Sequence, residues 1–459
     1  MSLYSAEYFR SWRQIERQTM NIFKAIAGPF TAALVILMAA GCHGHAPDNN
    51  YNENRKVLLF YECAFNDIGS YMKTNMDDPA KGLPAGYIPK KSEDVLLVYS
   101  RYSKNNSTYT PVESYLRRIY QNSKGKMISD TLKVFDSGTI ASSPETMREV
   151  LSYVKDEFPA KGYGMVFSSH GSGWLPAGYY NNPSRFESEH GNEIETKAQK
   201  TSLAAAGPAR AIPEGDLRDT DPFYGMVRSL GHDFIDSRNG YEMSISEFAD
   251  GIPYRLDYIL FDMCFTGGIE VAYGLKDKAD YLGLSPAEVL GDGMYDYTKI
   301  TSFLLASESP NLEGLFRDAF NMYDKQSGAY RSATVNLVRT DGLDNLAEVT
   351  ARLIDEYADT LSKAPASDIQ GYFRQGRHYF YDLVDIFAKC GVPESEVKTL
   401  QSAVDNCIIY KNATPSFLVN AFDITNYSGF SMYLPCNGTP LLDSYYKKEA
   451  WNTAVGLVK

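Results

Sequence analysis

Short apolar runs rich in β-branched residues recur along the chain and alternate with helical patterns. Four of these runs read as buried strands: Lys56–Tyr61, Asp94–Ser100, Gly164–Ser168 and Tyr258–Phe261. Strands that alternate with helices predict a mostly parallel sheet that is covered by helices on both faces. The hydrophobic pattern therefore indicates a protein of the α/β class.

Two of the expected helices begin with recognisable capping residues. Ser143 precedes Pro144, whose missing N–H does no harm in a first turn, and the helical pattern then continues to Phe158. Ser244 and Glu247 have the spacing of a capping box. We therefore expect one helix ahead of each of the last two strands.

The later part of the chain has a different pattern. Residues 180–240 are rich in Ala, Gly, Pro and charged residues without a sustained apolar period, which predicts a long exposed loop. After Asp296 the chain becomes more helical, with amphipathic segments at 345–363 and 369–390. A late run, SGFSMYLP at 428–435, reads as one more strand.

The N-terminal region has the pattern of an export signal. Lys24 gives a positive start, Ala32–Ala40 form an apolar stretch, and the small residues before Cys42 resemble a bacterial lipobox, in which the cysteine is lipidated after cleavage. A polar stretch typical of a tether follows. The alternative is a buried apolar helix. We exclude residues 1–50 from the fold and expect an exported protein, either secreted or held at a membrane or cell surface through a lipid on Cys42 alone.

Composition narrows the classes of partner. The 459 residues are 44% hydrophobic and 22% charged, as in packed globular proteins, and the formal net charge is −12. An acidic surface repels a phosphate backbone, so nucleic acid is not an expected partner.

The six cysteines lack the spacing of a metal site. The sequence contains no CxxC, HExxH or EF-hand pattern, so we expect no required metal. Up to two disulfides can form among Cys63, Cys390, Cys407 and Cys436, but the sequence does not assign the pairs.

A histidine and a cysteine each stand just beyond a predicted strand. His170 follows the strand that ends at Ser168, and Cys264 follows the strand Tyr258–Phe261. Ligands of open α/β sheets bind beyond the carboxyl ends of the strands, so both side chains are expected at one site. An expected helix start after Cys264 would favour the thiolate, and the imidazole could take the thiol proton. Gly171 would let backbone N–H groups approach a reacting carbonyl as an oxyanion hole, together with the Cys264 N–H.

Each of these residues alone also fits an ordinary structural role, since strand-end cysteines and histidines often only pack or form hydrogen bonds. Their joint occurrence favours a catalytic pair, with Cys264 as the nucleophile and His170 as the general base. A serine hydrolase is disfavoured because the chain has no G-x-S-x-G elbow. The main alternative is a catalytically inactive surface protein that binds peptides or glycans in the same cleft.

Two stretches of the chain resemble the clostripain family of cysteine peptidases, which belongs to the caspase-like clan. They are YGMVFSSHGSGW at 163–174 and DYILFDMCFTGGIEVAYGLKDKADYLGLSPAEVLGDG at 257–293. Asn66 after the first strand, the late SGFSMYLP run and Trp451 also have family counterparts, so the resemblance covers roughly residues 55–459.

The resemblance implies a caspase-like α/β/α sandwich in which His170 and Cys264 form a dyad. On this basis we expect a catalytic core over 51–310 and a C-terminal helical part over 311–459 that packs on it. The chain departs from the family at Phe265-Thr266, where Leu-Met is common. This departure leaves the dyad in place but affects the rim of the pocket.

The resemblance also implies cleavage after Arg or Lys. Residues two apart on a strand face the same side, so Asp262 is expected near Cys264, where its carboxylate could hold a basic substrate side chain. Asp262 matches a pocket residue of the family, and Asp292 resembles a second one. The alternatives are a strand-end cap for Asp262 and a turn residue for Asp292. The expected partners are peptides or proteins with Arg or Lys at the cleavage site.

Members of the family can be activated by cleavage of their own chain between the histidine and cysteine strands. In this chain that interval is the long loop, and its exposed basic residues are candidate cleavage sites: Lys197, Lys200, Arg210 and Arg218. We expect a monomer that becomes two associated chains after cleavage. Because calcium supports some relatives, calcium dependence stays open.

Overall fold

The computed structural model describes most of the chain beyond residue 53. The described residues are 54–77, 81–84, 87–88, 92–102, 110–180, 183–190, 230–234, 240–374, 379–419 and 421–459. Within these ranges no helix is long and apolar enough to cross a membrane.

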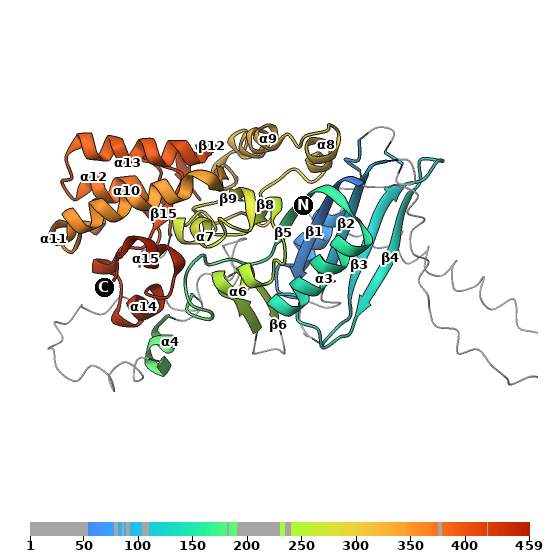
Figure 1. Ribbon diagram of the computed structural model, residues 1–459, viewed down its shortest axis with the longest axis horizontal. Coiled ribbons are helices and arrows are strands. Elements are labelled where there is room, and N and C mark those ends of the chain that lie inside the picture. The colour runs from blue at the N-terminus through green and yellow to red at the C-terminus, as the bar shows by residue number, and fades with distance from the viewer. Residues whose placement is uncertain are drawn as a thin grey trace, which may run out of the picture. The chain divides into compact units, whose positions relative to one another are not determined.

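The centre of the fold is a nine-stranded sheet with the strand order β12-β10-β9-β8-β5-β1-β2-β3-β4 (Figure 1). The five central strands, from β9 to β2, are parallel, and the pairs at both ends of the sheet are antiparallel. The strands are β1 (Asn54–Ala64), β2 (Asp94–Tyr102), β3 (Ser114–Gln121), β4 (Met127–Phe135), β5 (Ala160–Ser168), β8 (Leu256–Asp262), β9 (Ala279–Leu284), β10 (Thr334–Arg339) and β12 (Ile408–Ala413). The four strands expected from the sequence are confirmed as β1, β2, β5 and β8.

Helices cover both faces of this sheet, which confirms the expected α/β/α sandwich. One face carries α3 (Pro144–Glu157), α6 (Ile245–Asp250), α7 (Ile269–Gly274), α10 (Leu343–Glu356), α12 (Leu383–Lys389), α13 (Glu394–Cys407), α14 (Pro440–Tyr446) and α15 (Ala450–Val455). The other face carries α8 (Ile300–Leu305) and α9 (Leu312–Asp324), with Met76 of α2 (Gly69–Asp77) packed against the same apolar cluster. Alternate residues of the central strands β1, β2, β5 and β8 enter the two clusters, as the two-residue period of a strand requires.

Smaller elements connect the layers. They are the pairs β6 (Leu230–Phe234) with β7 (Gly240–Met243), β11 (Tyr381–Asp382) with β15 (Ser431–Met432), and β13 (Ser416–Phe417) with β14 (Phe422–Asp423), and the helices α4 (Pro183–His190) and α11 (Ala358–Leu361). Short 3-10 turns lie at Gly328–Tyr330, Thr340–Gly342, Ala366–Asp368 and Pro435–Asn437.

The two helix starts expected from the capping patterns are confirmed. Ser143 Oγ accepts the backbone N–H of Thr146 at the start of α3. Ser244 and Glu247 form a complete capping box at α6, in which each side chain accepts the other residue's backbone N–H.

The chain beyond residue 311 contributes to the sheet as well as to the helices. β10 and β12 form one edge of the sheet, so the boundary expected at 310/311 does not coincide with an edge of the core. The expectation of a continuous amphipathic segment at 369–390 is wrong, because helix α12 begins only at Leu383. Asp382 Oδ1 accepts the N–H groups of Val384 and Asp385 and so fixes the helix start there.

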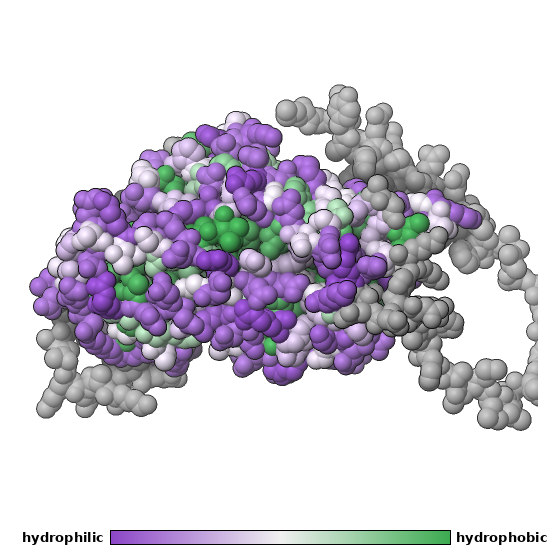
Figure 2. Space-filling model, turned by 45° about the horizontal axis from the view of Figure 1, so that its top comes forward, coloured by the Kyte–Doolittle hydropathy of each residue, from purple (hydrophilic) through white to green (hydrophobic). Residues whose placement is uncertain are grey.

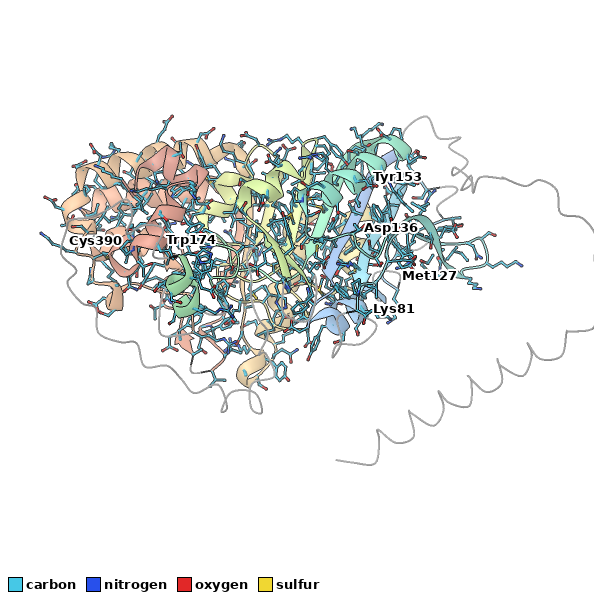
Figure 3. The ribbon with its side chains drawn as sticks, turned by 90° about the horizontal axis from the view of Figure 1, so that it is seen from below. Lys81, Met127, Asp136, Tyr153, Trp174 and Cys390 are labelled. Carbon is cyan, nitrogen blue, oxygen red and sulfur yellow. The ribbon has the colours of Figure 1, made fainter. Side chains whose placement is uncertain are left out.

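The surface and the cysteines add two observations. On the face in Figure 2 polar residues predominate, and hydrophobic residues occur in small separate groups. The cysteines of the described residues are all free thiols, so none of the four candidate disulfide residues is paired there. Figure 3 shows Cys390 among the C-terminal helices, far from Met127 on β4.

Candidate active site

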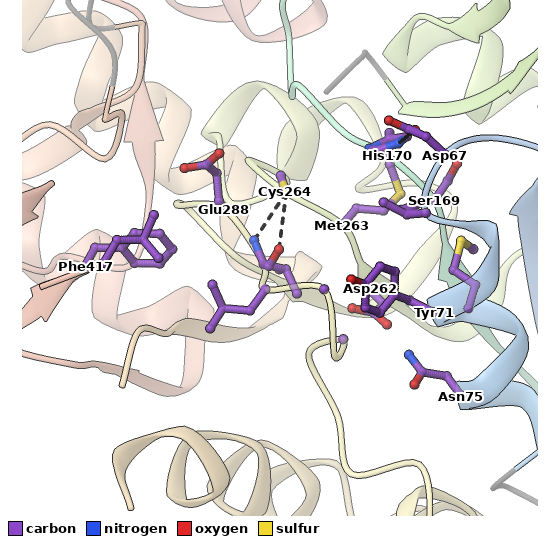
Figure 4. Close-up of a pocket in the computed structure, with 17 residues that line it drawn as sticks. Asp67, Tyr71, Asn75, Ser169, His170, Asp262, Met263, Cys264, Glu288 and Phe417 are labelled. Atoms are coloured by element: carbon purple, nitrogen blue, oxygen red, sulfur yellow. Dashed lines mark hydrogen bonds and ion pairs between the residues drawn. The ribbon is translucent and has the colours of Figure 1, made fainter. Parts of the chain in front are cut away.

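The carboxyl ends of β5 and β8 form one wall of a pocket. The two strands are neighbours, with Ser168 in register with Asp262. His170 lies two residues beyond the end of β5 and Cys264 two residues beyond the end of β8, and both side chains line the pocket (Figure 4). The remaining lining comes from 67–75, 288–293 and 417–418. The structure therefore brings the two expected catalytic residues into one cavity.

The imidazole of His170 is held by an acid. Its Nε2 lies 2.7 Å from Asp67 Oδ1, and the His170 side chain is 4% exposed whereas that of Asp67 is 32% exposed. A carboxylate on Nε2 favours the proton on that nitrogen, which leaves Nδ1 with the lone pair that a base needs. Nδ1 is thus the nitrogen of His170 that can accept a proton.

Sequence reasoning missed Asp67, although it noted the neighbouring Asn66. Asn66 is fully buried and donates to the carbonyls of Cys63 and His232, while its Oδ1 accepts the N–H of Ile68. This turn directs Asp67 towards the pocket. The available signal was an acid just beyond β1, because β1 pairs with β5 and ends at the same edge of the sheet.

Cys264 is held on the other side of the pocket. The backbone N–H of Val289 donates to Cys264 Sγ at 3.3 Å, and Sγ lies 3.7 Å from the carbonyl oxygen of the same residue. Burial and, to a smaller extent, the charge of Glu288 raise the pKa of the thiol to about 12, although the Val289 N–H and Arg374 oppose the shift. Cys264 is therefore a neutral thiol at pH 7, and it needs a base to become a nucleophile.

The expected helix dipole beside Cys264 is wrong. Helix α7 begins only at Ile269, and Cys264 lies in the turn between β8 and that helix. Helix dipole effects fall off within one turn, and the thiol pKa is raised rather than lowered. The small residues after Cys264 form a turn because the chain must reverse before it packs against the 285–287 segment.

The turn at Cys264 is tightly packed from both sides. A Cβ on Gly171 would lie 2.5 Å from the carbonyl oxygen of Cys264, so only glycine fits there. Phe265 has a φ of 56°, an uncommon conformation for a residue with a side chain. Its N–H donates to Ala287 O at 2.9 Å, and its ring stacks on Phe380 at 4.5 Å between centroids. These contacts hold the strained turn in place.

Asp262 is a buried acid in the same pocket. It is 8% exposed, Met294 N donates to its Oδ1 at 2.6 Å, and Tyr297 Oη donates to its Oδ2 at 2.5 Å. Burial raises the pKa of the Asp262 carboxyl, and these two donors oppose the shift. Gly293, with a φ of +86°, leaves this carboxylate accessible, because a Cβ there would lie 2.7 Å from Asp262 Oδ2. Asp262 can therefore present negative charge to the cavity.

Asp292 is placed differently from Asp262. It is exposed on a turn between Gly291 and Gly293, both of which line the pocket, whereas Asp292 itself does not. Its backbone carbonyl accepts the Nδ2–H of Asn75 at 3.4 Å.

A second ion pair borders the pocket on the Cys264 side. Arg374 Nε donates to Glu288 Oε1 at 3.0 Å and lies 2.8 Å from Oε2, with side-chain exposures of 16% and 9%. Glu288 lines the pocket beside Val289. Sequence reasoning missed this pair, and the sequence offered no signal for it because the partners are 86 residues apart.

Other expected site residues lie outside the described ranges. These are Lys197, Lys200, Arg210 and Arg218 of the long loop and Cys42 of the export signal. Within the described residues, no group of three or more His, Cys, Asp or Glu side chains is arranged to hold a metal ion.

Comparison with known proteins extends these observations. The model of the clostripain family (peptidase C11) matches residues 215–448, which is more than half of the chain. Clostripain from Hathewaya histolytica is 23% identical over 482 aligned positions, which cover 90% of this chain and 82% of that protein.

Solved structures share the fold. An inactive zymogen C11 protease from Parabacteroides distasonis has a TM-score of 0.67 and 22% identity over 88% of this chain and 99% of its own. A secreted C11 cysteine protease from Bacteroides thetaiotaomicron, in complex with an irreversible peptide inhibitor, has a TM-score of 0.65 and 20% identity over 87% of this chain and 98% of its own.

The family match includes Asp262 and Cys264, and the shared fold extends over nearly the whole described part of the chain. The pocket at the ends of β5 and β8 offers the thiol and the imidazole that a cysteine peptidase requires. The chain belongs to the clostripain family of cysteine endopeptidases.

Proposed function

We propose that this protein cleaves peptide bonds after Arg or Lys, with Cys264 as the nucleophile and His170 as the general base. The observation that supports this best is the acid Asp262, which is buried in the pocket that both residues line. A buried carboxylate with one side open to a cavity favours a cationic side chain, and a guanidinium can pair with both of its oxygens.

In the first step the thiol proton passes from Cys264 Sγ to His170 Nδ1. The sulfur attacks the carbonyl carbon of the substrate, and the carbonyl oxygen takes the negative charge. When the tetrahedral intermediate collapses, the peptide nitrogen leaves with the proton from His170 and a thioester remains on Cys264. Asp67 stabilises the imidazolium that exists between these two proton transfers.

In the second step water replaces the leaving amine. His170 takes a proton from the water, the hydroxyl oxygen attacks the thioester carbon, and the sulfur leaves and regains its proton. The acid product and the resting thiol result. Before each cycle Cys264 Sγ must leave Val289 and turn towards His170, and we propose that a bound substrate competes for the Val289 N–H.

The first experiment uses residues 51–459 and the variant Cys264→Ala on fluorogenic peptides that end in Arg, Lys, Asp or Leu. We expect cleavage after Arg or Lys by the parent protein and a loss of roughly 10⁴-fold or more in the variant, as for the removal of other catalytic nucleophiles. A thiol-blocking reagent should also abolish activity. Equal rates in both proteins would remove Cys264 from the mechanism, and binding without cleavage by either would favour the peptide-binding alternative.

A second variant tests the specificity acid. Asp262→Asn keeps the shape and the acceptor for Met294 but removes the charge, so we expect kcat/KM for the Arg peptide to fall about 10²- to 10³-fold, as for the loss of a buried ion-pair partner. The matched control is Asp292→Asn, which alters an exposed carboxylate and should change kcat/KM less than about threefold. A larger effect at Asp292 would make that residue the main pocket acid.

We also propose that the enzyme cuts its own chain after Lys197, Lys200, Arg210 or Arg218, and that it is exported with a lipid on Cys42. The zymogen described for the Parabacteroides relative supports self-cleavage, and the secreted relative from Bacteroides supports export. The lipid rests only on the lipobox pattern before Cys42. On a denaturing gel the active protein should give two bands and Cys264→Ala one. Identical single bands from both proteins would contradict self-cleavage.

A further inference from the structure

Four polar side chains cross the sheet beneath the pocket. They stand in register on adjacent parallel strands and so point to the same face of the sheet: Ser100 on β2, Glu62 on β1, Ser168 on β5 and Asp262 on β8. The preceding residues on that face are apolar, among them Phe60 and Leu260. Glu62 is thus a second carboxyl in the row that contains the specificity acid.

Ser168 is the only polar neighbour that lowers the pKa of Glu62, and its effect is small. It is 0% exposed, and neither of its carboxyl oxygens makes a hydrogen bond with any described residue. Burial raises the pKa of the Glu62 carboxyl well above its usual value, and the charge of Asp262 raises it further. Ser168 relieves little of this shift, because its hydroxyl is engaged with Tyr297 Oη at 3.2 Å.

The other groups around Glu62 do not supply a positive charge. Tyr297 and the thiol of Cys63 are neutral, and burial raises the pKa of both. Arg117 donates to Ser100 Oγ beside Glu62, but neither its guanidinium nor another cation is among the causes that shift the pKa of Glu62. On α2 Lys73 is exposed. Burial without a nearby cation therefore favours the protonated form of Glu62.

The two carboxyls differ in their donors. Asp262 receives hydrogen bonds from Met294 N and Tyr297 Oη, whereas Glu62 receives none. Of the pair, Asp262 thus ionises first and Glu62 keeps the remaining proton. The donors thus favour the charged form at Asp262 and the protonated form at Glu62.

We propose that Glu62 is a positioning residue for substrate selection, which releases its proton when a basic side chain binds beside Asp262. The inference rests on the proposed preference for Arg or Lys. The incoming cation stabilises a second negative charge, so Glu62–COOH becomes Glu62–COO⁻ and the proton passes to the buffer. The affinity for a basic side chain then rises with pH, because fewer protons must be displaced at higher pH.

The test is calorimetric binding to Cys264→Ala, which cannot turn over. Two peptides are used that differ only in the residue before the scissile bond, Arg in one and the uncharged isostere citrulline in the other. Titration in buffers of different ionisation enthalpy, from about pH 6 to about pH 9, counts the protons released. The Arg peptide should release up to about one proton per site, and the citrulline peptide none.

The double variant Cys264→Ala/Glu62→Gln assigns that proton. Glutamine has nearly the shape of glutamate but does not titrate. This variant should therefore bind the Arg peptide without proton release, and its affinity should not depend on pH. Glu62→Met serves the same purpose if the glutamine variant does not fold, since an apolar side chain of similar length suits a site without hydrogen-bond partners.

The outcomes distinguish a failure of the proposed specificity for Arg or Lys from a failure of the proposed role of Glu62. If Cys264→Ala binds the Arg and citrulline peptides equally or not at all, the proposed specificity itself is wrong. If it prefers the Arg peptide but releases the same number of protons with and without Glu62, the specificity stands and the role of Glu62 is refuted.

Discussion

His170 and Cys264 lie at the same edge of the sheet, yet their surroundings differ. The His170 half of the pocket comes from β1 and β5, where Asn66 and Asp67 hold the imidazole in the orientation of a base. In the Cys264 half the thiol rests on the backbone of Val289, and burial raises its pKa to about 12. His170 is therefore hydrogen-bonded as a general base requires, whereas Cys264 rests as a neutral thiol that must first lose its proton.

This difference has a structural cause. Asp67 and His170 follow directly from two paired parallel strands, so the sheet fixes their separation. Cys264 depends on segments that arrive from elsewhere in the chain, since Val289 belongs to the loop after β9 and Arg374 to the segment before β11. A change in any of these segments should therefore alter the position or the pKa of the Cys264 thiol without moving the imidazole of His170. We therefore expect conditions that control activity to act on the Cys264 half.

Among the substitutions that change the surroundings of the two catalytic residues and not the residues themselves, the largest effect is expected in the His170 half. Asp67→Asn keeps the size of the side chain but removes the charge that fixes the imidazole, so kcat should fall roughly ten- to a hundredfold while KM changes little. The measurement is the pH profile of kcat and of KM for the Arg peptide. Asp67→Glu should recover part of kcat, because the carboxylate is restored. A loss confined to KM would make Asp67 a substrate contact instead.

The sequence predicted the catalytic residue of each half but missed the side chain that supports it. His170 and Cys264 could be placed at one edge because two apolar runs end just before them, and parallel strands end together. Asp67 was missed because its direction depends on the buried side chain of Asn66, which no periodicity reveals. Glu288 was missed because its role depends on Arg374, whose position follows from the tertiary fold.

The antiparallel edge of the sheet was also missed, for a different reason. β3 and β4 carry charged and partly exposed residues without a clean two-residue alternation, since this edge is only half covered. The run at 369–390 has a helical period, but Asp382 caps the helix late, and Gln370 forms hydrogen bonds with the backbone of Asp423 and Thr425. Local propensity therefore failed where tertiary contacts decide the backbone.

A smaller effect is expected from changing the charges beside Cys264. Glu288 raises the pKa of the thiol and Arg374 lowers it, so Glu288→Gln should lower that pKa and Arg374→Gln should raise it. At a fixed pH below the pKa, alkylation of Cys264 by iodoacetamide should become about three- to tenfold faster in the first variant and slower in the second.

Alkylation is followed by mass spectrometry of the peptide that contains Cys264, because Cys436 is exposed and also reacts. Glu313→Gln is the matched control, since Glu313 is exposed on α9 and pairs with Arg317. Its alkylation rate should equal that of the parent protein. If both pocket variants shift the rate in the same direction, the charges do not control the thiol.

The smallest effect is expected from changing a buried residue that supports the Cys264 half of the pocket. Glu270 on α7 is buried, and its Oε1 accepts the N–H of Tyr433 at 2.9 Å and the hydroxyl of Tyr446 at 2.7 Å. Burial raises the pKa of Glu270 to about 7, and these donors oppose the shift. The folded state thus binds a proton that the unfolded state loses near pH 4.5, so stability should fall as the pH rises from about 4.5 to about 7 and then level off.

Glu270→Gln retains an oxygen that can accept both hydrogen bonds and removes the titration. It should gain roughly 1–3 kcal/mol over the parent protein at pH 8 and little at pH 4.5, as measured by urea unfolding at a series of pH values. Asp67→Asn is the comparison from the other half and should leave this slope unchanged, because Glu270 titrates independently of His170. A parallel loss of slope in both variants would mean that the two halves of the pocket unfold and titrate as one unit, and the contrast between them would then be confined to the resting geometry of the thiol.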